Sequence, residues 1–438
     1  MRERINKLND ILKFGIIILF INYIFMTCLI WAISTTYNSA PDENLKFTLC
    51  KYLSENWKLP HGGDEAIRDE QWGISYAFTP YLAYMIASIF IRITRIFTDN
   101  FYSMVVSARF LSVICITLYS IMCIKISKKL FIGIYQYFFI ALTTQIPQVL
   151  YLGSYINNDS FALFIISLII YCWICGIKSN WKIKDCIFLG ISLGLCALSY
   201  YNAYGYILCS VLIFIGSSIN EKIGFKEILK KGILIFLIAF LISGWFFIRN
   251  FIIYNGDFLG NNISAKYGEK YALEQYKPSN LNRLDTNLEW KKWKTETYRS
   301  FIGYFGYLTV PINGNIYYFF SNIFLVGIYG IVLNFIQKKK ENHKEDKNQK
   351  LFKLTMFISI LIPVILSLYY SIFGDFQAQG RYLMPGIIPF MYYIVNGIKI
   401  VMENYIKQEK IKNLIIILII FISIIPIYTY FNYIRLLS

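Results

Sequence analysis

The chain has 438 residues, of which 56% are apolar and 18% aromatic. A soluble domain of this length cannot bury so much apolar surface, so lipid must cover much of it. The net charge of +17 would suggest a nucleic-acid partner in a soluble protein. Here the Lys and Arg residues lie in short tracts between apolar runs, where they meet anionic lipid headgroups. We therefore exclude nucleic acid as a partner and predict an all-α integral membrane protein.

Apolar windows with basic flanks predict about 11 membrane-spanning helices, because each window approaches the length needed to cross ~30 Å of hydrocarbon. The expected spans lie near residues 12–35, 101–124, 130–150, 160–177, 186–200, 203–218, 232–253, 315–336, 351–373, 381–401 and 413–432. No small-residue cleavage site follows the first run, so we expect a retained span rather than a signal peptide.

The apolar stretch from Trp72 to Ile91 decides the topology. If it does not cross, the tracts on the N-terminal side of the membrane hold 25 Lys and Arg residues and the opposite loops hold 15. The positive-inside bias then places the N-terminus in the cytoplasm and the C-terminus outside. We expect this stretch to be a helix that lies in the outer leaflet or dips into it, kinked near Pro80.

This topology predicts a single polytopic domain over residues 1–438 in the cell membrane. It has two large outer loops: residues 36–100, acidic and containing the juxtamembrane helix, and residues 254–311. The spans show no inverted pair of interrupted segments, which mildly disfavours a transporter.

Two acidic points fall on the same predicted face of the membrane. Asp42 and Glu43 follow Pro41 close to the end of the first span, and Asp159 follows Asn157 and Asn158 at a span end. A carboxylate fixed at the membrane surface can act as a general base or bind a divalent cation. The alternatives are a solvated acidic loop and, for Asp159, a helix cap.

Three arginines lie within or at the ends of expected spans at one depth: Arg109, Arg249 and Arg381. Inserting an arginine into the membrane costs roughly 2.5–3.5 kcal/mol of free energy on insertion scales. Each of the three therefore needs a charged partner or a function that offsets this cost. Guanidinium groups at headgroup level suit a lipid-linked phosphate. Snorkelling to the interface, or pairing with the acidic loop, remains an equal alternative for each.

Short motifs in a fixed order resemble the GT-C class of membrane glycosyltransferases, which use polyprenyl-phosphate sugars. The resemblance is to the protein mannosyltransferase and aminoarabinose transferase group, in a subgroup of bacterial envelope proteins. It covers nearly the whole chain and rests on Pro41-Asp42-Glu43, Thr79-Pro80-Tyr81, Ala108-Arg109-Phe110-Leu111-Ser112, Asn158-Asp159, Gly244-Trp245, Arg249-Asn250, Gly256-Asp257 and Gln379-Gly380-Arg381-Tyr382-Leu383 with Pro385.

The resemblance implies a role for each matching position. Asp42 looks like the catalytic base or metal-organising carboxylate, with Glu43 as its neighbour in the motif and Asp159 as the second acid. It also implies a donor phosphate site of Arg109, Arg249, Arg381 and Tyr382, and a sugar or acceptor site of Asp69, Glu70, Asn158 and Gln379. A divalent cation, Mg or Mn, on Asp42 and Asp159 is a further expectation.

The sequence departs from the mannosyltransferase pattern around Thr79-Pro80, where a proline pair and a histidine are missing. That departure favours transfer onto an envelope glycan or a lipid-linked glycan over transfer onto protein. The leading hypothesis is therefore an inverting glycosyltransferase with a polyprenyl-phosphate sugar donor and a glycan or glycolipid acceptor outside the cytoplasm. A lipid-linked glycan flippase or other transporter, and a glycan polymerase, remain alternatives.

Overall fold

The computed structural model describes residues 2–281, 284, 286–341 and 346–437. Its α-helices are α1 (Arg2–Ser34), α2 (Glu43–Glu55), α3 (Leu82–Arg95), α4 (Phe101–Leu130), α5 (Ile134–Thr144), α6 (Pro147–Leu152), α7 (Asp159–Ser179), α8 (Ile183–Ala197), α9 (Gly205–Asn220), α10 (Phe225–Ile253), α11 (Asn261–Tyr271), α12 (Asn287–Ile302), α13 (Gly314–Glu341), α14 (Lys347–Phe373), α15 (Ile387–Tyr405) and α16 (Gln408–Asn432). Strands β1 (Tyr304–Phe305) and β2 (Val310–Pro311) form a small antiparallel hairpin.

Short 3₁₀ helices join several of these elements. They are η1 (Tyr76–Phe78), η2 (Tyr201–Ala203), η3 (Glu274–Tyr276), η4 (Pro278–Asn280), η5 (Gly380–Gly386) and η6 (Ile434–Leu437). The η5 helix carries Arg381 and Tyr382, two of the residues predicted to bind the donor phosphate.

Within the described residues, nine helices are long and apolar enough to cross a membrane: α1, α4, α7, η2 with α9, α10, α13, α14, η5 with α15, and α16 with η6. They correspond to nine of the expected spans, so the multi-pass, all-α architecture is confirmed. The exact count of 11 is not. The expected span 130–150 is two helices, because α5 ends before Pro147 begins α6. The expected span 186–200 is α8, whose 15 residues rise about 22 Å.

The stretch from Trp72 to Ile91 differs from its prediction in one respect. Helix α3 begins at Leu82, and η1 and an extended segment precede it, so Pro80 lies before the helix and does not kink it. The physical reason is that proline lacks an N–H donor and disfavours helical geometry in the residue before it. The 14 residues of α3 are too few to span a bilayer, which needs about 20.

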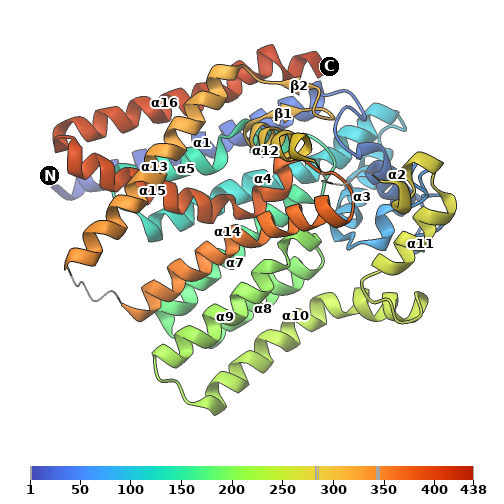
Figure 1. Cartoon of the computed structure of the whole chain (residues 1–438), viewed down its shortest axis with the longest axis horizontal. Coiled ribbons are helices and arrows are strands. Elements are labelled where there is room, and N and C mark those ends of the chain that lie inside the picture. Colours follow the sequence, from blue (N-terminus) through green and yellow to red (C-terminus); the bar gives the residue numbers. More distant parts are fainter. Residues whose placement is uncertain (1, 282–283, 285, 342–345, 438) are drawn as a thin grey trace.

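The long helices lie side by side in a bundle, and α2, α3, α11, α12 and the β hairpin gather at one end of it (Figure 1). The chain's C-terminal segment lies at that same end, because the N–H of Thr36 donates to the carbonyl of Leu437 at 2.8 Å. The N-terminus lies at the opposite end (Figure 1). Which end faces the cytoplasm stays a prediction from charge.

Small residues allow close packing where two of the spans cross. A Cβ placed on Gly330 of α13 would lie 1.9 Å from the carbonyl oxygen of Gly397 in α15. Contacts of this kind, without side chains between the backbones, are typical of helix pairs in lipid. Helix α10, by contrast, exposes Phe236, Leu241 and Ile248, as expected of a face covered by lipid.

Candidate active site

Asp42 lies where the chain turns from α1 into α2. Its backbone is left-handed (φ 59°, ψ 19°) at the N-cap of α2, a conformation that Asp and Asn adopt more readily than most residues. The Oδ2 atom of Asp42 accepts hydrogen bonds from the Tyr76 hydroxyl at 3.1 Å and from Nη2 of Arg381 at 3.2 Å. The side chain keeps 31% of its surface exposed, so an acceptor can reach it.

The charges around Asp42 keep its carboxyl ionised. Burial alone would raise its pKa, but the positive charges of Lys46 and Arg381, with the hydrogen bonds from Arg381 and Tyr76, lower it below the ordinary value. At neutral pH the group is therefore a carboxylate, the form that can accept a proton from an incoming hydroxyl.

Lys46 is a site residue that the sequence analysis missed. It follows Asp42 by one helical turn, and its Nζ lies 3.8 Å from the Asp42 Oδ2 atom while donating to the carbonyl of Pro41 at 2.9 Å. The ammonium also lies over the rings of Tyr76 and Tyr155. Its side chain is only 1% exposed, and burial lowers its pKa to about 8.

Asp159, the first residue of α7, is buried and faces the same cluster. It interacts electrostatically with Arg381, Lys46 and Asp42. The two acidic points that lie 117 residues apart in the sequence are therefore brought together around two cations. Asn158, just before Asp159, is also buried, and its Nδ2 has no hydrogen-bond partner within the described residues.

Glu43 and Arg109 form a buried pair apart from this cluster. The Arg109 Nε and Nη2 atoms donate to the two carboxylate oxygens of Glu43 at 2.8 and 2.7 Å. The remaining N–H groups of Arg109 donate to three backbone carbonyls at the end of α1, those of Ala32, Thr35 and Thr36. All five donors of the guanidinium are thus used by the protein, which disfavours the predicted role of Arg109 in phosphate binding.

The same geometry disfavours a chemical role for Glu43. Its carboxylate also accepts from the backbone N–H groups of Asn38 and Ile156, at 3.0 and 3.1 Å. The side chain is fully buried. We therefore assign Glu43 a positioning role, with Asp42 alone of the acidic pair turned toward the cluster.

The other predicted site residues divide into two groups. Tyr382 accepts from Arg381 Nη2 at 3.1 Å, and Gln379 lines a pocket beside Arg381. Arg249 instead donates to the carbonyls of Leu59 and Pro60. In the first loop, Asp69 caps a turn by accepting from two backbone N–H groups, and Glu70 is exposed. Within the described residues, the hydrogen bonds of Arg249 and Asp69 thus lead away from the Asp42 cluster.

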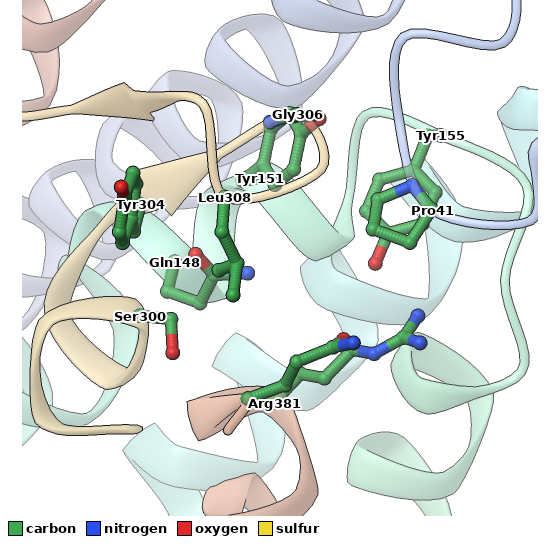
Figure 2. Close-up of a pocket in the computed structure, with 10 residues that line it drawn as sticks. Pro41, Gln148, Tyr151, Tyr155, Ser300, Tyr304, Gly306, Leu308 and Arg381 are labelled. Atoms are coloured by element: carbon green, nitrogen blue, oxygen red, sulfur yellow. Dashed lines mark hydrogen bonds between the residues drawn. The ribbon is translucent and has the colours of Figure 1, made fainter. Parts of the chain in front are cut away.

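The pocket beside Arg381 is small, with an empty volume of about 260 Å³ that includes its open mouth. In Figure 2 the Tyr155 hydroxyl points toward the Arg381 guanidinium, while Ser300 and Tyr304 line the opposite side from Pro41. The lining residues come from α6, α12, the β hairpin, η5 and the segments just before α2, α7 and η5. They are Pro41, Gln148, Tyr151, Tyr155, Ser300, Tyr304, Gly306, Leu308, Gln379 and Arg381.

The cluster does not provide a fitted site for a resident metal ion. Among the described residues, no three His, Cys, Asp or Glu side chains lie close enough together to hold one. Glu43, the natural third carboxylate, is occupied by Arg109, and Asp42 and Asp159 already face Lys46 and Arg381. A dication would be repelled by those two charges, so the expected Mg or Mn is not favoured by this arrangement.

Residues 66–391 match the family model for predicted membrane proteins designated DUF2142. The chain belongs to this family. No curated protein matches the sequence, so comparisons beyond the family rest on structure.

Similar solved structures are those of membrane enzymes. The archaeal oligosaccharyltransferase AglB from Archaeoglobus fulgidus, in complex with an inhibitory peptide and a dolichol-phosphate, superposes with a TM-score of 0.52 at 12% identity. The match covers 93% of this chain and 54% of AglB. ArnT from Cupriavidus metallidurans bound to undecaprenyl phosphate gives a TM-score of 0.52 at 11% identity, covering 90% of this chain and 61% of ArnT.

These similarities confirm the expected GT-C fold. The chain spans a little over half the length of the enzymes it resembles. At such low identity the likeness extends to the fold alone.

The buried ion pair between Glu43 and Arg109 predicts a large effect on stability. Replacing Glu43 by Ala leaves the Arg109 charge buried without its partner, which should destabilise the protein by about 3–5 kcal/mol. Thermal unfolding in detergent would show a lowered Tm. The exposed pair Arg68–Glu65 supplies the control, since Glu65→Ala should change Tm little. An unchanged Tm for Glu43→Ala would contradict the proposed positioning role.

Gly380 generates a second prediction. A Cβ on Gly380 would lie 2.1 Å from the backbone nitrogen of Phe301, so Gly380→Ala must push η5 away from α12 and move Arg381 from Asp42. We expect about 1–3 kcal/mol of destabilisation. In Gly386→Ala, the matched control from the same segment, the nearest atom lies 3.5 Å away. Equal Tm values for the two variants would show that the close contact between Gly380 and the backbone of Phe301 does not hold η5 in place.

Proposed function

We propose that the chain is a GT-C type glycosyltransferase that moves a sugar from a polyprenyl-phosphate donor to a hydroxyl of an envelope glycan or lipid-linked glycan. The observation that carries the proposal is the Asp42 cluster. It combines an ionised, partly exposed carboxylate with two buried cations at one end of a membrane bundle. Both AglB and ArnT in the compared structures hold a lipid phosphate, which supports this donor class.

Arg381 is the residue best suited to the donor phosphate. Its Nη2 atom bonds Asp42 and Tyr382, whereas its Nε is buried with no partner among the described residues. An unpaired donor of a buried guanidinium is costly unless a ligand fills it, and phosphate oxygens are strong acceptors for it. The lipid tail would then lie along the apolar helices, with its phosphate at the end of the bundle.

The transfer step follows from the same geometry. An acceptor hydroxyl attacks the anomeric carbon and passes its proton to the Asp42 carboxylate. The bond from that carbon to the phosphate oxygen breaks, and its electron pair remains on the phosphate. Fixed positive charge from Arg381 and Lys46 stabilises the charge that develops on the leaving group. Attack from the side opposite the phosphate inverts the anomeric centre.

Asp42 is a better base than Asp159 because of exposure. Asp42 keeps nearly a third of its surface open, whereas Asp159 is 6% exposed. Asp159 instead balances the two cations from the interior side. This division of roles makes Asp159 a positioning residue for Arg381 and Lys46.

A transporter remains the second candidate, and the placement of buried charge speaks against it. A flippase needs polar groups along a path through the whole membrane. Within the described part of the chain, the buried charged side chains are Glu43, Lys46, Arg109, Asp159 and Arg381. Their mutual contacts place all five at the end of the bundle that carries α2.

Asp42→Asn tests the proposed base. Asn fits the left-handed backbone and keeps an acceptor for Tyr76, so we expect folded protein with the transfer rate reduced at least about 100-fold, the low end for general-base catalysis. Transfer from a radiolabelled polyprenyl-phosphate sugar measures the rate. Asp99→Asn, in the same loop but exposed, should keep its rate, and an active Asp42→Asn would sink the assignment.

The buried ammonium predicts an alkaline limb in the pH profile. Lys46 is charged below its lowered pKa of about 8 and neutral above it, so kcat/KM, which reports the free enzyme, should fall as pH rises through about 8. Arginine stays charged at these pH values, so in Lys46→Arg the fall should move to higher pH. An alkaline limb at the same pH in both proteins would assign the titration to another group.

A further inference from the structure

Resting on the proposed function, we propose that Gln377 is a positioning residue for the donor phosphate. It orients the Tyr382 hydroxyl and, through that hydroxyl, the guanidinium of Arg381. Gln377 is half-buried and lies in the segment between α14 and η5. Its side chain bonds Tyr382, Gln379 and Asp375, so its effect on Arg381 passes through Tyr382.

A continuous chain of hydrogen bonds joins Gln377 to the proposed base. The Oε1 atom of Gln377 accepts from the Tyr382 hydroxyl at 3.2 Å, and its Nε2 atom donates to Oδ2 of Asp375 at 2.8 Å. Tyr382 in turn accepts from Nη2 of Arg381 at 3.1 Å, and the same nitrogen donates to Asp42 at 3.2 Å. Two carboxylates, Asp375 and Asp42, therefore lie at the two ends of one chain.

The carboxylate of Asp375 sets the direction of this chain. A carboxylate accepts hydrogen bonds and cannot donate them, so the amide N–H group of Gln377 must face Asp375 and its carbonyl oxygen must face Tyr382. Gln379 reinforces that orientation, because its Nε2 donates to the same oxygen at 2.8 Å. The phenol therefore gives its single proton to Gln377 and turns its lone pairs toward Arg381.

The direction of the Tyr382 hydroxyl matters for the guanidinium. The Arg381 Nη2 atom has two N–H groups, and it uses one on Asp42 and one on Tyr382. Because a guanidinium is planar, two bonds from one nitrogen fix the direction in which its other N–H groups point. Without the acceptor on Gln377, the phenol proton can turn toward Arg381, and Asp42 alone then orients Nη2. A less ordered arginine binds a phosphate more weakly, because binding must then order it.

The backbone of this segment is held without the help of the Gln377 side chain. The backbone N–H of Gln377 donates to Ser371 Oγ at 3.3 Å, and that hydroxyl also accepts from Trp293 Nε1 at 3.1 Å. Further along, the N–H of Gly380 donates to Ser300 Oγ at 2.7 Å. A change confined to the Gln377 side chain should therefore leave the path of the chain intact, which separates positioning from folding.

Binding of undecaprenyl phosphate to the full-length protein in nanodiscs, measured by native mass spectrometry, tests the proposal. Gln377→Leu removes the side-chain hydrogen bonds at similar volume, and we expect the affinity to fall about 3- to 10-fold, as loss of one hydrogen bond does. Gln136→Leu is the matched control, because Gln136 is also half-buried and donates to the carbonyl of Phe131, beyond the C-terminal end of α4. Equal affinities of the two variants would overturn the inference.

A double-mutant cycle with Tyr382→Phe separates positioning from a general loosening of the site. Phenylalanine lacks the hydroxyl through which Gln377 acts. Once Tyr382→Phe is present, Gln377→Leu should therefore lower the affinity for undecaprenyl phosphate no further. Losses that multiply in the double variant would show that Gln377 acts by another route, and the inference would fail.

A charge swap keeps the proposal testable if Gln377→Leu does not fold. Gln377→Glu sets a second carboxylate against Asp375, and the repulsion between like charges should weaken binding of undecaprenyl phosphate. Adding Asp375→Asn restores an N–H donor at that contact, leaves an acceptor for Tyr382 and returns the net charge to its original value. We expect the double variant to recover the wild-type affinity within about twofold. A double variant that binds no better than Gln377→Glu would contradict the proposed chain.

Arg381→Met separates this inference from the function on which it rests. If undecaprenyl phosphate binds, Arg381→Met abolishes that binding and Gln377→Leu leaves it unchanged, only the role of Gln377 fails. If undecaprenyl phosphate does not bind at all, or binds regardless of Arg381→Met, the proposed function itself fails.

Discussion

The buried ion pair between Glu43 and Arg109 is the interaction on which the rest of the site depends. It joins the end of α1, the start of α2, the first half of α4 and the segment before α7, because both side chains also bond backbone groups from these segments. A charge pair in a membrane protein is stable only when its desolvation is repaid by such complete hydrogen bonding. Once this pair is formed, Asp42 is fixed at the surface of the bundle and Asp159 is brought near it.

The cluster around Asp42 contains equal numbers of acidic and basic side chains. Asp42 and Asp159 supply two negative charges, and Lys46 and Arg381 supply two positive ones. Burial weakens screening, so each group feels the others strongly. The neighbouring cations lower the pKa of Asp42, whereas burial lowers the pKa of Lys46 to about 8 and the nearby carboxylates oppose that fall. A bound lipid phosphate would add negative charge to this balance and thereby favour the protonated form of Lys46.

Much of the fold could be predicted from the sequence, because membrane spans are recognisable by their length and apolarity. Nine of the expected spans followed from apolar windows and charge counts, and the GT-C fold followed from the family resemblance. The sequence analysis put Asp42, Asp159 and Arg381 in one site, but it also put Arg109 and Arg249 there, and the hydrogen bonds of those two arginines lead elsewhere. Helix α2 and the position of Lys46 were not predicted, because the acidic residues of this loop are equally typical of a solvated loop. A helix starting at Glu43 would have placed Lys46 one turn from Asp42, where such pairs meet. The polar residues that line the pocket beside Arg381 come from segments far apart in the sequence, so no local sequence pattern predicts them.

The two residues of the acidic motif show why adjacency in sequence is a poor guide to shared function. Backbone geometry at Asp42 is left-handed, so its side chain and that of Glu43 leave the turn in different directions. One faces Arg381 and retains solvent access, and the other faces Arg109 and has none. Exchanging their order would place the longer side chain at the surface and shorten by one methylene the side chain that accepts the two hydrogen bonds of Arg109. The order of the motif thus matches the proposed base at the first position and the buried ion pair at the second.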